Sequence, residues 1–87
     1  MKFLCSWTIN PKDRDEAWRR LKTVHDGGGD GIRVIGYWHN VTLLGGWAVV
    51  EADTELALAK WMARWTDLNP HDATVVIDGD EGFAAMS

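Results

Sequence analysis

The residues best suited to chemistry are His39 and Tyr37, which lie two positions apart near the middle of the chain. They belong to a run rich in β-branched and aromatic residues that predicts a strand over residues 32–39. Side chains two apart on a strand share a face, so the imidazole would lie beside the phenol and could act as a general acid or base. The structural alternative is a histidine bonded to a backbone carbonyl or to Glu51 at a subunit interface.

Three further side chains are expected on the same sheet face. Two come from a predicted first strand, residues 3–8, and one from a predicted third strand, residues 43–51. Hydroxyl groups there could orient a ligand against an indole ring, and nearby glycines (Gly36, Gly45 and Gly46) would leave room for it. We therefore predict a ligand site made of Ser6, Thr8, Tyr37, His39 and Trp47. The alternative for Ser6 and Thr8 is that small polar residues simply suit a half-buried strand.

Tryptophan is unusually frequent, with six among 87 residues. So small a domain has few interior places for such large side chains, so some should lie at an interface or line a pocket. Trp61 and Trp65, together with Trp47, could form a pocket for a flat ligand. However, Leu58, Met62 and Trp65 repeat at helical spacing with Trp61 beside them, which favours a packed core.

Several function classes are disfavoured. The net charge of −4 and the pI of about 5.1 give no basic stripe for nucleic acid. The glycine run 27–29 follows a predicted helix instead of preceding one, which argues against a phosphate loop. The acidic residues near the C-terminus are too scattered for a calcium loop. We therefore expect no cofactor, no metal and no nucleic-acid partner, and we assign no catalytic residue.

Cys5 is the single cysteine, so an intramolecular disulfide is impossible, and on its strand it is expected to be an inert core thiol. No apolar run is long enough to span a membrane, so no membrane partner is expected, and the first eight residues are too short and polar for a signal peptide. The cytoplasm is the expected location.

The order of elements predicts the fold of one domain over residues 1–87. A helix is expected over residues 13–25, opened by a capping box from Asp13 to Glu16. A second helix should begin after Asp53 or Thr54 and end at residues 69–70, followed by a fourth strand over residues 72–77 and a possible helical turn in residues 81–87. The resulting β-α-β-β-α-β order predicts an α+β, ferredoxin-like domain with a four-stranded antiparallel sheet and two helices on one face.

Alternate side chains along each predicted strand point to opposite faces of the sheet, which divides the strand residues into two sets. The uniformly apolar set is assigned to the helices: Phe3, Cys5, Trp7, Val34, Trp38, Ala48, Val50, Val75 and Ile77. The opposite face would expose Leu4, Ile35, Tyr37, Trp47, Val49 and Val76 together, an apolar patch that indicates an interface. A homodimer that packs this sheet face against that of a second copy is the simplest way to bury the patch. Gly45 and Gly46 indicate either a bulge or a close approach by another group. A bulge would move the side chains of part of the third strand to the opposite face of the sheet.

The opening residues 3–8, the Gly36-Tyr37-Trp38-His39 run, and residues 48–51 leading into a helix with Trp61 and Trp65 resemble an uncharacterised family of short bacterial and cyanobacterial proteins. That family of unknown function is placed among the dimeric α/β-barrel proteins. The resemblance covers about residues 1–77. It implies the fold and a sheet-to-sheet dimer, and it implies no activity.

Two functions remain open. The first is a non-enzymatic homodimeric module that binds a small apolar or aromatic ligand, or only its own copy. The second is a small cofactor-free enzyme, resembling a monooxygenase or an isomerase, that acts on an apolar or aromatic substrate. A cavity with converging polar groups would be needed for the enzyme, whereas a solid core would favour the module.

Overall fold

Strands and helices alternate along the chain in the predicted order. The computed structural model describes residues 1–24 and 28–87. Its elements are β1 (Lys2–Thr8), a 3-10 turn (Pro11–Asp13), α1 (Arg14–Val24), β2 (Ile32–His39), β3 (Gly45–Ala52), α2 (Glu55–Met62), β4 (His71–Val76) and α3 (Gly79–Ala85). The predicted end of the first helix at His25 and the start of the glycine loop lie outside the described residues.

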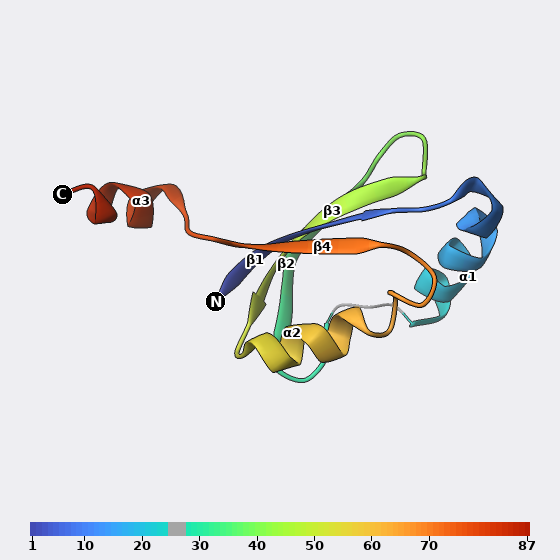
Figure 1. The fold of residues 1–87 in the computed structure, drawn as a ribbon, viewed down its shortest axis with the longest axis horizontal. Coiled ribbons are helices and arrows are strands. Elements are labelled where there is room, and N and C mark those ends of the chain that lie inside the picture. Colours follow the sequence, from blue (N-terminus) through green and yellow to red (C-terminus); the bar gives the residue numbers. More distant parts are fainter. Residues whose placement is uncertain (25–27) are drawn as a thin grey trace.

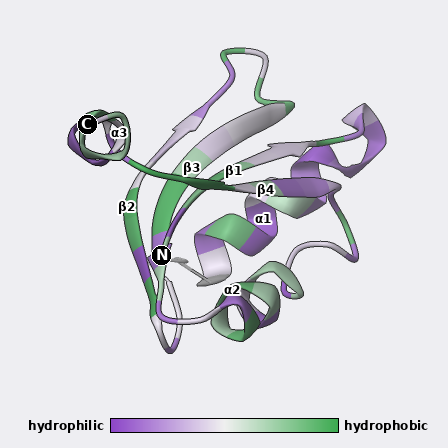
Figure 2. Ribbon diagram, turned by 60° about the vertical axis from the view of Figure 1, so that its left-hand side comes forward, coloured by the Kyte–Doolittle hydropathy of each residue, from purple (hydrophilic) through white to green (hydrophobic). Residues whose placement is uncertain are grey.

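The four strands form one sheet in the order β2-β3-β1-β4, and every neighbouring pair is antiparallel (Figure 1). This confirms the α+β, ferredoxin-like arrangement. Figure 2 shows α1 and α2 on one side of the curved sheet, with α3 on the other side of the strands. We call the sheet face turned away from α1 and α2 the open face.

Helix starts follow local side-chain chemistry. Thr54, one of the two predicted caps, begins α2 by accepting a hydrogen bond from the backbone N–H of Ala57 at 3.0 Å. The predicted capping box at the start of α1 is wrong, because Glu16 is held by Arg19 one turn later and the chain enters α1 through a 3-10 turn. A complete capping box instead starts α3, between Asp78 and Glu81.

The bulge lies in β2, not at the glycines of β3. Val34 pairs with Val50 and Gly36 pairs with Val49, which leaves Ile35 as the extra residue. Beyond the bulge every side chain changes face relative to a regular strand. The predicted face is therefore wrong for Tyr37 and His39, which point to the helices.

Trp38 changes face in the opposite direction. It pairs with Trp47, which pairs in turn with Ser6, so all three lie on the open face. The assignment of Trp38 to the helix side is therefore wrong. Val75 and Ile77, also assigned to the helix side, are exposed beyond the cover of α1 and α2.

The core lies where α2 covers the centre of the sheet. Phe3, Cys5, Ala48 and Val50 are buried there, as the strand parity predicted. Leu58 of α2 packs onto this cluster, and Trp61 and Met62 are only partly buried against it. The helix side of the sheet is therefore filled on one part and hollow on another.

Candidate functional site

A cavity of about 610 Å³ separates the sheet from α1 and α2. Its size falls in the range of small-molecule sites. Its floor includes Cys5 and Ala48 of the sheet, and its helical walls include Ala17 and Leu21 of α1 and Met62 of α2. The aromatic and polar side chains that line it are Trp7, Trp18, Lys22, Tyr37, His39, Trp61, Trp65, Asn69 and His71, of which Lys22 is exposed.

Three aromatic rings surround the imidazole of His39. Its ring centroid is 4.4 Å from Trp18, 5.5 Å from Tyr37 and 5.9 Å from Trp7. These rings come from α1, β2 and β1 respectively. Gly46, which pairs with both Trp7 and His39 in the sheet, leaves the gap through which the Trp7 indole approaches. The glycine therefore provides the predicted close approach.

Burial lowers the pKa of His39 from its ordinary value of 6.5, because a charged imidazole would lose its hydration among these rings. Its Nδ1 atom is buried without a hydrogen-bond partner. At neutral pH the ring is therefore uncharged. Depending on the tautomer, the unpaired Nδ1 carries either a lone pair or an N–H.

Two other buried polar atoms of the described residues also lack partners, the indole Nε1 of Trp61 and the Oδ1 of Asn69. Asn69 is only 3% exposed. Both residues line the cavity, as His39 does. An unpaired buried polar atom costs free energy, so three at one cavity indicate a place where a bound molecule or water completes the bonding.

His71, at the start of β4, extends the aromatic wall by stacking on Trp7 with a centroid distance of 5.8 Å. Its Nδ1 lies 2.9 Å from the backbone carbonyl oxygen of Asn69, which can only accept, so Nδ1 donates. In the neutral ring this tautomer leaves Nε2 as a hydrogen-bond acceptor.

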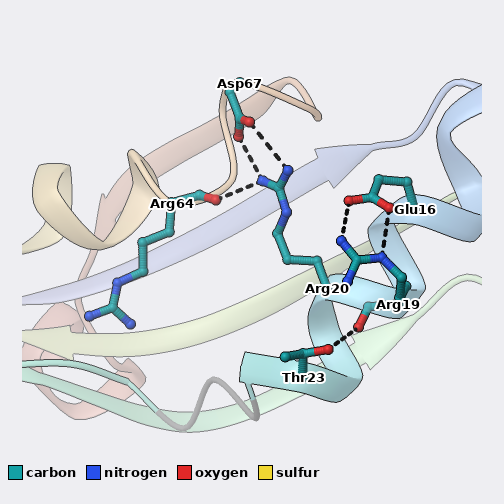
Figure 3. A network of polar contacts seen from close by, with 6 residues as sticks. All are labelled: Glu16, Arg19, Arg20, Thr23, Arg64 and Asp67. Atoms are coloured by element: carbon teal, nitrogen blue, oxygen red, sulfur yellow. Dashed lines mark hydrogen bonds and ion pairs between the residues drawn. The ribbon is translucent and has the colours of Figure 1, made fainter.

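Side chains, more than close backbone packing, hold α1 over the cavity. The indole of Trp18 donates to the carbonyl of Leu43 at 3.3 Å, in the loop between β2 and β3. Leu43 itself has a φ of 64°, an uncommon conformation for a branched residue. At the other side, Arg20 binds Asp67 at 2.7 and 3.2 Å and the carbonyl of Arg64 at 3.0 Å (Figure 3). Together these bonds tie α1 to the hairpin loop and to the segment after α2.

The cavity contains no activated nucleophile of the cysteine type. Burial raises the pKa of the Cys5 thiol to about 11, so the thiol stays protonated at neutral pH. Within residues 1–24 and 28–87, no three His, Cys, Asp or Glu side chains come together where they could hold a metal ion. The chemistry available is therefore hydrogen bonding, ring stacking and proton transfer through imidazole.

The predicted site residues fall on two faces. His39 and Tyr37 line the cavity, whereas Trp47 pairs with Ser6 on the open face and Thr8 shares their parity. The sheet separates the two groups, so the grouping of all five is wrong. Trp61 and Trp65, for which pocket and core were both open, line the cavity, and Trp65 is also largely buried.

Sequence reasoning missed Trp7, Trp18, Asn69 and His71 as lining residues. One signal was available for two of them. Trp7 ends β1 and His71 begins β4, so an antiparallel pairing of the first and last strands places them side by side, as observed. Trp18 and Asn69 carried no comparable signal, because their positions depend on how the helices stand off the sheet.

Comparison with known proteins places the chain in a family without assigning an activity. Among the described residues, no helix is long and apolar enough to cross a membrane. No curated protein matches the sequence. A family model described as "Domain of unknown function (DUF3303)" matches residues 1–87, and the chain therefore belongs to this family.

Proposed function

We propose that this protein binds a small, flat, uncharged ligand in the cavity between the sheet and the two helices. One observation carries the proposal: three buried polar atoms without partners, on His39, Trp61 and Asn69, all belong to residues that line one apolar cavity of about 610 Å³. A ligand with both a donor and an acceptor would complete bonds that the protein leaves open. On this proposal the protein acts as a binding module.

The lining defines the ligand class. Indole rings of Trp7, Trp18 and Trp61 offer flat apolar surfaces, which suit an aromatic or similarly planar molecule. The ionisable groups in the interior, Cys5 and His39, are both uncharged at neutral pH, and the cationic Lys22 lines the cavity only with an exposed side chain. A charged ligand would therefore lose its hydration without an ion-pair partner in the interior, so a neutral one is favoured.

Binding of two matched probes tests the proposal. 2-Naphthol and naphthalene share a ring system, but only 2-naphthol can accept from Trp61 Nε1 and donate to Asn69 Oδ1. Two modest hydrogen bonds should give 2-naphthol about tenfold higher affinity in calorimetry or fluorescence titration. Trp61→Phe keeps an aromatic ring but removes the donor, so it should reduce this preference.

Trp47→Phe is the matched control, since Trp47 lies on the open face. It should leave both affinities unchanged. Failure of both probes to bind, or an effect of Trp47→Phe in place of Trp61→Phe, would count against the cavity as the binding site.

A cofactor-free enzyme is the second candidate, and one observation favours it. The uncharged His39 has an unpartnered Nδ1 and contacts Tyr37, so it could accept a proton from a bound substrate. 2-Tetralone, a ketone fused to a flat aromatic ring and carrying acidic C–H bonds, is a suitable probe. An enzyme of this kind would speed its deuterium uptake from D2O, and His39→Gln would abolish that acceleration.

We propose also that the protein is a homodimer through the open face, as in the dimeric α/β-barrel proteins. Trp38 and Trp47 form a pair there and are 57% and 46% exposed, and Leu4 is exposed on the same face, where it pairs with Val49. An apolar group of this kind on a small domain supports an interface. Sedimentation should give a dimer at micromolar concentration, and Trp47→Lys should weaken it because an unpaired charge would enter the contact.

The single buried cysteine supports a reducing, cytoplasmic location, because Cys5 has no second cysteine for an intramolecular disulfide.

A further inference from the structure

The C-terminal helix α3 stands away from the rest of the molecule. Figure 1 shows it at the end of an extended continuation of β4, beyond the ends of the strands. In Figure 2 the strands separate it from α1 and α2, so it projects on the side of the open face. An ion pair of 3.8 Å between Lys2 and Asp78 holds its base to the start of β1.

One side of α3 forms an apolar stripe at helical spacing, made of Gly79, Gly82, Phe83 and Met86. These four residues line a shallow notch of about 260 Å³. Phe83 and Met86 are 80% and 88% exposed. A side chain added at either glycine would meet nothing within 4 Å, so the notch is open to a neighbouring molecule.

An isolated helix of seven residues is marginal in water, even with the Asp78–Glu81 capping box. Burial of an apolar stripe against another surface is the usual source of stability for so short a helix. Such burial would remove Phe83 and Met86 from water.

The chain has a larger accessible surface and a larger radius of gyration than a compact domain of its size. Its accessible surface is 5950 Å², whereas a compact monomer of 9.8 kDa exposes about 5,200 Å². Its radius of gyration is 14.1 Å, against about 12 Å for a compact domain of this length. The excess of roughly 750 Å² is close to what each partner buries in a stable dimer, ~800 Å².

We propose that α3 is an arm exchanged between two copies of this chain, packing Phe83 and Met86 against the partner's open face beside the indoles of Trp38 and Trp47. This inference rests on the sheet-face homodimer proposed above. In a twofold dimer each copy contributes one arm and one open face, so both apolar stripes are covered in the same way. The acidic residues Asp78, Asp80 and Glu81 at the base of the arm disfavour an anionic membrane as the occupant.

Sedimentation of full-length variants tests the arm. Phe83→Ser with Met86→Ser removes the apolar contacts of both arms in the dimer and should raise its dissociation constant by about 100-fold or more. Leu56→Ser is the matched control, because Leu56 is an exposed leucine on α2, outside the arm and the sheet. It should leave the dissociation constant unchanged. Circular dichroism verifies that each variant keeps its fold.

A mixed dimer of isotope-labelled and unlabelled chains provides the direct readout. Nuclear Overhauser contacts should connect Met86 or Phe83 of one copy with Trp38 or Trp47 of the other. A wild-type dimer that is unaffected by the double substitution and shows no such contacts would overturn the arm while leaving the sheet-face dimer in place. A monomeric wild-type protein would overturn both.

Discussion

Trp7 and His39 meet edge to face, with ring centroids 5.9 Å apart, although β3 lies between their strands. Both residues pair with Gly46, the residue of β3 that lies between them. Neighbouring strands are about 4.8 Å apart, so a side chain on the central residue would normally stand between the two rings. The contact that shapes the floor of the cavity therefore depends on a missing Cβ atom.

Gly46→Ala should consequently destabilise the protein. The new methyl group would clash with the backbone carbonyl oxygen of Trp38 and come within 2.5 Å of the Trp7 ring, so the strand would have to shift and the indole would have to move away from His39. Overpacking of this kind costs about 1–3 kcal/mol in the free energy of unfolding, which urea denaturation measures. Val41→Ala, at a fully exposed loop position, is the control. Unchanged stability of Gly46→Ala would show that neither the backbone at Trp38 nor the indole of Trp7 needs this position to be glycine.

The lowered pKa of His39 predicts a pH dependence of stability. The unfolded chain, with an ordinary value of 6.5, binds a proton more readily than the folded protein. Stability therefore rises with pH between the lowered folded-state pKa and 6.5, and it is lost as the pH falls through that window. Between pH 7.5 and pH 5.5, His39→Gln should lose less of its free energy of unfolding, measured with urea, than the wild-type protein loses. The other histidines are present in both proteins, so the difference reports on His39. Equal losses would exclude His39 as the source.

The bonds from Arg20 predict which substitution loosens α1. Arg20→Ala removes the contacts to Asp67 and to the carbonyl of Arg64, which link α1 to the segment after α2. Hydrogen exchange of the α1 amides should become several-fold faster, and probe binding in the cavity should weaken. Arg19→Ala makes the same charge change, but the bonds it removes, to Glu16, lie within α1. Equal acceleration in both variants would contradict the assigned role of Arg20.

Local signals in the sequence were sufficient for the strands and for the start of α2, but the second helix was predicted to run to residues 69–70 and α2 ends at Met62. The bounds of β2, the cap at Thr54 and the strand order all follow from residue types and spacing. The faces of the sheet required more, because parity counting assumes a regular strand. One extra residue, Ile35, reversed the side of Tyr37, Trp38 and His39 and so divided the predicted site between two faces.

The glycines of β3 explain why the bulge was misplaced. A glycine in a strand indicates either a bulge or a close approach, and only the packed structure distinguishes them. Gly46 accommodates the Trp7 ring, while the bulge lies in β2 at a β-branched residue that gives no such signal. The cavity itself depends on α1 standing off the sheet through Trp18 and Arg20, a distance that no residue pattern specifies.

The most direct test of ligand binding in the cavity follows the indole N–H signals in a nitrogen-15 NMR spectrum while 2-naphthol is added. The six tryptophans report separately on the cavity and on the open face. Binding in the cavity predicts that the Trp61 Nε1–H signal shifts most, with Trp7 and Trp18 following, while Trp38 and Trp47 stay in place. Shifts confined to Trp38 and Trp47, with Trp61 unchanged, would place the ligand on the open face and contradict the account.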